Sequence, residues 1–161
     1  MIEFRPLKYS SLVHLTQVLN DVEISAFDYS ALDYEKMHSF VVIDGDNTIG
    51  LCLYTFLSVD TALVKLVYIK PSERNLKLGD GLLRASLNSI EIHGGERVIF
   101  EGNLTEQSFY LHEGMTKLND FSEVEMASFS HGMEWLEDRY YACCKSISSF
   151  FSKPCKGQSK Q

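Results

Sequence analysis

The sequence predicts a single α/β domain with a mixed β-sheet, and three observations lead to this prediction. Segments rich in β-branched and aromatic residues alternate with segments in which apolar residues recur every three or four positions. Glycine-containing turns separate these segments. The chain has 161 residues, 45% of them hydrophobic and 23% charged, which is enough for one sizeable core. We therefore expect one domain over residues 1–151 and a polar, mobile tail over residues 152–161.

The amino-terminal half is predicted to form a strand, two helices and three further strands. Residues 1–7 alternate apolar and charged side chains, as a half-buried strand does. Ser10 or Ser11 can cap a helix with an apolar stripe formed by Leu12, Leu15, Leu19 and Val22. Residues 23–37 are less regular and are expected to include a shorter helix. The three strands that follow are predicted over residues 39–44, 48–59 and 61–70.

The carboxyl-terminal half begins with a predicted helix from about Leu78 to His93, ended by Gly94 as a C′ residue. A strand over 97–102 and a short helix that stops at Gly114 come next. One or two strands are expected within residues 117–129. Residues 132–151 are predicted as a last amphipathic helix, because one helical stripe carries Leu136, Tyr140, Cys144, Ile147 and Phe151. This helix either covers the sheet or forms a homodimer contact.

Charge and cysteine usage favour some classes of protein over others. The formal net charge of −7 argues against a nucleic-acid partner, which would need a basic surface. The chain has neither an apolar run of 18 residues nor a secretory signal, so we expect no membrane partner and a cytoplasmic location. Cys52 is interpreted as a core residue of a strand, and Cys143, Cys144 and Cys155 as lying on or after the last helix. Without any CxxC pair, no metal site is expected.

The segment "PSERNLKLGDGLL", residues 71–83, joins a predicted strand to a predicted helix through two glycines. Such a junction can bind an anion, because the first helical N–H groups lack intrahelical acceptors and glycine lets a ligand approach the backbone. A plain turn is the alternative. Two phosphate motifs are excluded: Lys77 precedes the glycines, contrary to a P-loop, and Arg84 occupies the third small position of a dinucleotide fingerprint.

Over a longer window, "YIKPSERNLKLGDGLL" resembles the acyl-CoA-binding segment of the GNAT superfamily of N-acetyltransferases. Ile69 and Pro71 supply the strand end of that pattern, Arg74 its first loop position, and Gly79 its last, with Leu82–Leu83 at the helix start. Lys77 departs from it, since the family usually has a glycine there.

A second block, "NLTEQSFYLHEGM", resembles another GNAT pattern through Asn103, Tyr110 and Gly114. Met115 replaces its usual Phe, and Glu106 stands where a small residue is usual.

The resemblance implies a mixed, mostly antiparallel central sheet flanked by helices, with the fourth and fifth strands splayed apart and an extra C-terminal helix. It also implies an N-acetyltransferase that moves an acetyl group from acetyl-CoA, its co-substrate, to a primary amine by direct attack in a ternary complex. One alternative is a catalytically silent acyl-CoA-binding sensor or regulatory module. Another is an interaction protein that kept the fold and lost the ligand.

By the same resemblance, the pantetheine arm would lie on the main chain of Val67, Tyr68 and Ile69. The pyrophosphate would lie on a loop formed by Arg74, Asn75, Leu76, Lys77, Leu78, Gly79 and Asp80. If the missing glycine needed a positive φ, Lys77 would be strained. An ordinary helix entry is the simpler expectation, in which lysine costs little and offers a cation to the phosphates.

Tyr110 would protonate the leaving thiolate, or alternatively pack in the core as an aromatic residue. Asn103 would contact the pantetheine arm or cap the following helix. Glu101 is a candidate general base, as are Asp28 and Glu23, each with the alternative of a solvated surface carboxylate. The segment with Phe27, Asp28 and Tyr29 is both polar and aromatic, which suits either a packed surface helix or a substrate wall, and these three residues are the candidates for the wall.

Overall fold

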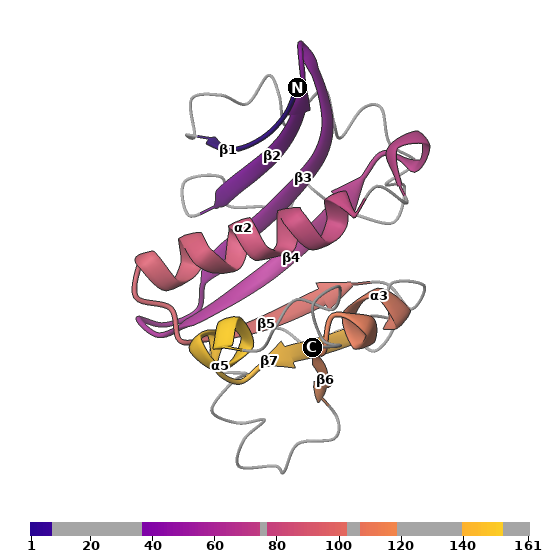
Figure 1. Cartoon of the computed structure of the whole chain (residues 1–161). Helices are drawn as coiled ribbons and strands as arrows, with labels where there is room; N and C mark the ends of the chain where they lie inside the picture. The colour runs from indigo at the N-terminus through magenta and orange to yellow at the C-terminus, as the bar shows by residue number, and fades with distance from the viewer. Residues whose placement is uncertain (8–36, 75–76, 103–106, 119–139, 153–161) are drawn as a thin grey trace. The chain divides into compact units, whose positions relative to one another are not determined.

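The computed structural model describes residues 1–7, 37–74, 77–102, 107–118 and 140–152. Within these ranges the chain forms β1 (Ile2–Leu7), β2 (His38–Asp44), β3 (Asn47–Phe56), β4 (Thr61–Ile69), the 3₁₀ helix η3 (Pro71–Glu73), α2 (Leu78–Ile92), β5 (Arg97–Gly102), α3 (Gln107–His112), β6 (Thr116–Lys117), β7 (Tyr140–Cys144) and α5 (Ile147–Ser152) (Figure 1).

The strands form one sheet in the order β1-β2-β3-β4-β5-β7-β6. Neighbouring strands are antiparallel except β4 and β5, which are parallel and are joined through α2. A parallel pair needs such a crossover, because a tight turn can only join antiparallel strands. The mixed, mostly antiparallel sheet predicted from the sequence is therefore confirmed, whereas the splay of its fourth and fifth strands stays a prediction.

Two compact units divide the chain. The first comprises Met1–Thr55 and Val64–Ser86, and the second comprises Phe56–Leu63 and Leu87–Gln161. In the first unit, β1 pairs with β2 and β2 with β3, both antiparallel, and the β2–β3 register shifts between Val42 and Ile43. In the second, β5 and β6 both pair antiparallel with β7.

The core of the first unit lies between its strands and the first turns of α2. Val41, Leu51, Leu82 and Leu83 are fully or almost fully buried there. A Cβ atom at Gly81 would lie 2.6 Å from the Phe4 ring, so the helix packs closely on β1 only because residue 81 has no side chain. Cys52 is a buried residue of β3, as predicted.

The ends of α2 agree with the sequence prediction. Gly94 has φ +95°, its N–H donates to Glu91 O at 3.0 Å, and the N–H of Gly95 donates to Ile90 O at 2.8 Å. This pair of bonds is the Schellman motif, in which the residue after the helix must take a left-handed conformation. The predicted apolar stripe is also correct, because Leu83, Leu87 and Ile90 are all fully buried.

The predicted last helix over 132–151 is wrong over its second half. From Tyr140 on, where the structure describes the segment, Tyr140–Cys144 is the strand β7 and Ile147–Ser152 is helical. All five residues of β7 are buried. A strand covered on both faces shows no alternation of apolar and polar residues. Its apolar residues therefore include some at the three- and four-residue spacing that also predicts an amphipathic helix. Cys143 and Cys144 consequently lie in a strand, not on a helix as expected.

Several predictions fall on residues outside those that the structure describes. They concern the helices expected within residues 8–36, the part after Leu118 of the segment 117–129 in which one or two strands are expected, Cys155 and the tail after Ser152. Ser152 itself ends α5.

Candidate functional site

The end of β4, where the sequence places the pantetheine arm, lies directly on β3. The Lys70 N–H donates to Ile49 O at 2.8 Å. A Cβ atom at Gly50 would lie 2.5 Å from Ile69 Cδ1 and 3.0 Å from Tyr68 O. Glycine at position 50 thus permits an approach that no other residue would allow. The two strands together fix the position of the main chain of Val67, Tyr68 and Ile69.

Arg74 folds back onto this strand end. Its Nε donates to Ile69 O at 2.9 Å, and its guanidinium carbon lies 5.6 Å from the centre of the Tyr68 ring. These contacts hold an exposed cation within one turn of the strand terminus. The next two loop residues, Asn75 and Leu76, are outside the described ranges.

Lys77 has φ +59°, which corrects the expectation of an ordinary helix entry. Among the described residues, it alone combines a side chain with a positive φ. The first helical bond of α2 runs from Gly81 N–H to Lys77 O at 3.2 Å, so Lys77 occupies the N-cap position. A glycine would take this left-handed conformation without strain, whereas Lys77 bears its cost.

The two glycines that mark the junction in the sequence both lie inside the helix. Gly79 and Gly81 lie within the first turn of α2, and neither has a positive φ. The N–H groups of Leu78, Gly79 and Asp80 precede the first intrahelical donor, so they point out of the helix terminus. The Asp80 carboxylate accepts bonds from Arg84 Nε, at 3.1 Å to each oxygen. The junction therefore combines helix N–H groups with two nearby cations, Arg74 and Lys77, which is a favourable setting for an anion.

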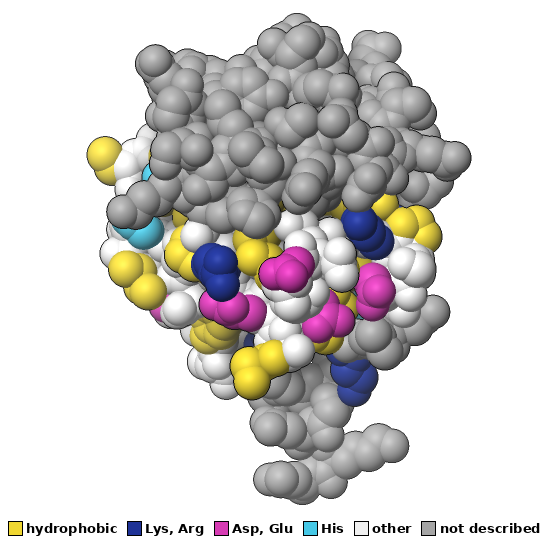
Figure 2. Space-filling view, turned by 90° about the horizontal axis from the view of Figure 1, so that it is seen from above, with side chains coloured by type: hydrophobic (Ala, Val, Ile, Leu, Met, Phe, Trp, Pro, Cys, Tyr) yellow, Lys and Arg dark blue, Asp and Glu magenta, His cyan; other side chains and the backbone are white. Residues whose placement is uncertain are grey.

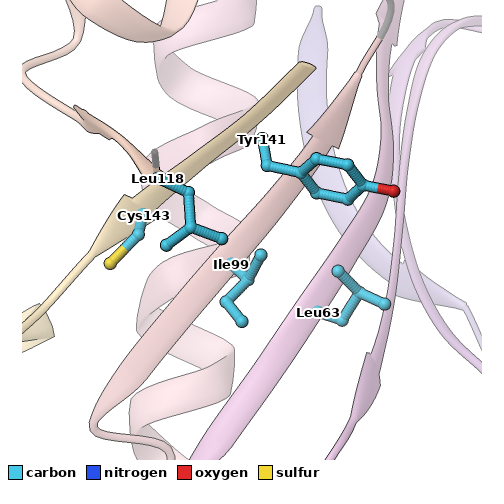
Figure 3. Close-up of a cluster of buried hydrophobic side chains, with 5 residues drawn as sticks. All are labelled: Leu63, Ile99, Leu118, Tyr141 and Cys143. Carbon is cyan, nitrogen blue, oxygen red and sulfur yellow. The ribbon is translucent and has the colours of Figure 1, made fainter. Parts of the chain in front are cut away.

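In the second unit, Glu101 lies near the carboxyl end of β5 and is only 5% exposed. Its partner in register on β7 is Tyr141, whose hydroxyl donates to Glu101 Oε1 at 3.4 Å. Tyr141 packs with Leu63, Ile99, Leu118 and Cys143, and Figure 3 shows its ring lying across β5. The alternative of a solvated surface carboxylate is thus wrong for Glu101.

Tyr110 lies on α3 and is completely buried. Its ring centre is 5.1 Å from that of Phe100 and 6.3 Å from that of Tyr140, with 15° between the planes of the two tyrosines. Phe109 meets the same ring edge-on at 5.3 Å. The aromatic packing foreseen as one role of Tyr110 is therefore present.

The helix that carries Tyr110 ends in a second Schellman motif. Gly114 has φ +87°, its N–H donates to Leu111 O at 3.1 Å, and the Met115 N–H donates to Tyr110 O at 3.0 Å. Met115 is 4% exposed. The glycine and the buried apolar residue of the sequence pattern are therefore explained by helix capping, and methionine fills the place of phenylalanine.

Glu101 and Tyr110 lie on opposite faces of the β5–β7 pair. Residues directly opposite each other on antiparallel strands share a face, and successive residues alternate. Glu101 shares its face with Tyr141, whereas Tyr110 stacks on Phe100 and Tyr140 of the other face. The structure therefore does not bring the two predicted catalytic side chains together. Asn103, Phe27, Asp28, Tyr29 and Glu23 fall outside the described residues.

Sequence reasoning missed Tyr140 and Tyr141, because it assigned them to a helix. The signal that would have found them is the aromatic pair in "YYACC", since aromatic residues are enriched in strands. In a strand, adjacent tyrosines must point to opposite faces, and here each meets one of the two candidate catalytic residues.

The described cysteines are all buried. Burial raises the pKa of the Cys52 thiol to about 12, although a hydrogen bond with Ser86 opposes the shift. This thiol stays protonated near neutral pH and is a poor nucleophile.

Charged side chains of both signs are mixed on the described surface. Figure 2 shows acidic, basic and apolar side chains interspersed on the described part of one face. No group of three or more histidine, cysteine or acidic side chains there is placed to hold a metal ion. None of the helices in these ranges is long and apolar enough to cross a membrane.

Comparison with solved structures identifies the architecture. An acetyltransferase of the GNAT family from Staphylococcus aureus Mu50 superposes with a TM-score of 0.69 at 15% identity, covering 89% of this chain and 98% of that one. GCN5 from Tetrahymena gives 0.66 at 13% identity, covering 88% and 94%. The chain has the GNAT fold. No protein-family model matches the sequence, and no curated protein does.

A third structure with the GNAT fold contains a ligand. N-acetylglutamate synthase from Neisseria gonorrhoeae, complexed with coenzyme A and N-acetylglutamate, gives a TM-score of 0.62 at 12% identity. The match covers 89% of this chain and 34% of the synthase. Sequence identities this low show that the folds are similar, and any activity of this chain depends on its own residues.

Proposed function

We propose that the chain is an acyl-CoA-dependent N-acetyltransferase with acetyl-CoA as co-substrate and a primary amine as acceptor. The observation that carries this proposal is the junction from β4 to α2 within the GNAT fold. There, Arg74 is held at the strand end, Lys77 takes a left-handed conformation where the GNAT pattern has a glycine, and the helix N–H groups follow. This arrangement suits a pyrophosphate, whose charge both the cations and the helix terminus stabilise.

Calorimetric titration of acetyl-CoA tests the proposal. Arg74→Gln keeps a donor near Ile69 O but removes the charge, and we expect it to weaken binding about tenfold. Arg5→Ala is the matched control, because Arg5 is an exposed arginine of the same unit that pairs with Glu3 at 2.8 Å. Its affinity for acetyl-CoA should equal that of the native chain. Absence of binding to any acyl-CoA would contradict the proposal and favour an interaction protein.

The proposed chemistry is direct transfer. The amine nitrogen forms a bond to the acetyl carbon, and the carbon–sulfur bond breaks. Tyr110 gives a proton to the departing thiolate, and the proton that the amine loses passes to water. Glu101 is not given the role of base in this step, because it lies on the face of the β5–β7 pair opposite Tyr110. The buried state of the described cysteines supports direct transfer over an acyl-cysteine intermediate.

The burial of Tyr110 favours a second candidate function. A hydroxyl that protonates a thiolate must meet it, and the Tyr110 side chain is 0% exposed in the free chain. An acyl-CoA-binding module without turnover would need no such access. Release of free thiol from acetyl-CoA in the presence of a panel of primary amines separates the two, since the module binds acetyl-CoA and releases none.

A further inference from the structure

The peptide group that joins Ile69 and Lys70 at the end of β4 is bound on both sides. Its N–H donates to Ile49 O of β3 at 2.8 Å, and its carbonyl accepts a hydrogen bond from Arg74 Nε at 2.9 Å. In a trans peptide the N–H and the C=O point in opposite directions, so Arg74 binds on the side of β4 that faces away from β3. The guanidinium is therefore tied to a fixed point of the main chain.

A single turn of 3₁₀ helix brings Arg74 back to this point. The turn η3 occupies Pro71–Glu73, and the Arg74 N–H donates to Pro71 O at 3.4 Å. Proline suits the start of such a turn, because its fixed φ is already helical and its missing N–H is not needed there. Arg74 itself is extended, with φ −70° and ψ 162°, so the return of the chain introduces no backbone strain.

The Tyr68 ring is a second anchor for the guanidinium. Tyr68 is half-buried in β4, and its carbonyl oxygen lies 3.0 Å from the position that a Cβ atom of Gly50 would occupy, so its main chain is held close to β3. The Arg74 guanidinium carbon lies 5.6 Å from the ring centre, within the range of a cation–π interaction. An arginine side chain has a large rotamer entropy, and the two anchors reduce it before any ligand binds.

The two anchors involve the Nε and the face of the guanidinium, not its Nη groups. The Nη groups carry four of the five N–H donors of an arginine, and these match a pair of phosphate oxygens. Resting on the proposed function, which supplies the diphosphate of acetyl-CoA, we infer that Tyr68 is a positioning residue. Its ring holds the Arg74 guanidinium in place, so that the Nη groups meet the diphosphate at a smaller ordering cost.

A double-mutant cycle tests this role. Acetyl-CoA and inorganic pyrophosphate are titrated calorimetrically into the full-length chain and its variants. Tyr68→Leu removes the ring and should weaken the binding of both ligands about two- to fivefold, the range expected for an exposed cation–π contact. In an Arg74→Gln background the same substitution should change neither affinity. Tyr68→Phe retains the ring and should bind both ligands within about twofold of the native chain.

Phe40→Leu is the matched control, because it removes a half-buried ring from β2 in the same unit. It should leave both affinities unchanged. A loss of equal size in Tyr68→Leu with and without Arg74 would show that Tyr68 only supports the fold, and would overturn the inference. A loss in Tyr68→Phe as large as that in Tyr68→Leu would also overturn it, because the effect would then belong to the hydroxyl.

The two ligands separate this inference from the proposed function. Acetyl-CoA binding that Tyr68→Leu does not weaken contradicts only the inference. Pyrophosphate binding that depends on Tyr68 and Arg74 as expected, without any binding of acetyl-CoA, contradicts only the proposed function. If neither ligand binds, both proposals fail.

Discussion

The left-handed conformation of Lys77 makes a quantitative prediction about stability. Lys77 is exposed, so replacing it removes little packing. A non-glycine residue in this region costs about 1–2 kcal/mol. Glycine avoids that cost but loses about 0.5–1 kcal/mol through its greater freedom in the unfolded chain. Lys77→Gly should therefore stabilise the fold by about 0.5–1 kcal/mol, which for a chain of this length raises the melting temperature by about 1–4 °C.

Lys77→Ser is the control, and whether the glycine or the serine variant is more stable tells a left-handed position from an ordinary N-cap. Both substitutions remove the same positive charge from the amino terminus of α2, so the helix dipole contributes equally to each. If φ is positive, serine shares the strain of lysine and the glycine variant is the more stable one. If the position were an ordinary N-cap, serine would accept a bond from the helix and would be as good as glycine or better.

Urea unfolding followed by circular dichroism measures the difference. A serine variant as stable as the glycine variant, or more stable, would refute the left-handed assignment. The same two variants also test whether the Lys77 ammonium contributes to acetyl-CoA binding, because both lack this charge and differ only in backbone strain. If Lys77 contacts the phosphates of acetyl-CoA, both variants should bind it more weakly than the native chain, with a smaller dependence on salt.

Three further predictions concern single side chains. Tyr110→Phe should lower kcat at least about a hundredfold while KM for acetyl-CoA changes little, and an unchanged kcat would assign Tyr110 to packing alone. Gly114→Ala should destabilise the fold by about 1 kcal/mol, because φ is +87° and no atom lies within 4 Å of the added Cβ; a neutral result in thermal melts would contradict this origin. Asp60 accepts bonds from Ser58 and Thr61 and pairs with Arg97, so its pKa lies below the ordinary 3.8. A lowered folded pKa stabilises the native state above pH 3.8, so Asp60→Asn should melt earlier than the native chain at pH 7, with a gap that closes as the pH falls through the lowered pKa.

The elements predicted correctly are those whose local sequence pattern is compatible with only one type of secondary structure. The strands from His38 to Ile69 are rich in β-branched and other apolar residues, and α2 has both an apolar stripe and a glycine directly after it. Those signals fixed each element to within a few residues. β7 was missed because five buried residues carry no periodicity that distinguishes a strand from a helix.

The candidate site was harder to predict than the fold, for two physical reasons. A position with a positive φ can be recognised in a sequence when it is occupied by glycine, but the lysine at position 77 does not indicate one. The face on which a strand residue lies depends on where its neighbours pack. The sequence places Glu101 and Tyr110 nine positions apart, but only the packing of Tyr110 on Phe100 and Tyr140 shows that the two lie on opposite faces.

The similarity of the segment "NLTEQSFYLHEGM" to the GNAT pattern has a structural part, which is helix capping and packing, and a part that these do not explain. Its spacing from Tyr110 to Gly114 and Met115 is the spacing of a Schellman motif, in which the carbonyl of Tyr110 accepts the N–H of Met115. Any side chain at position 110 would offer that carbonyl, so capping explains the glycine and not the tyrosine. The aromatic contacts with Phe100 and Tyr140 explain a ring at this position, and phenylalanine would satisfy them equally. What remains specific to tyrosine is its hydroxyl. A chain selected for packing alone has no reason to keep a hydroxyl at a fully buried position, where it must be hydrogen-bonded or pay a desolvation cost. Tyr110→Phe therefore isolates the one atom that neither capping nor stacking accounts for.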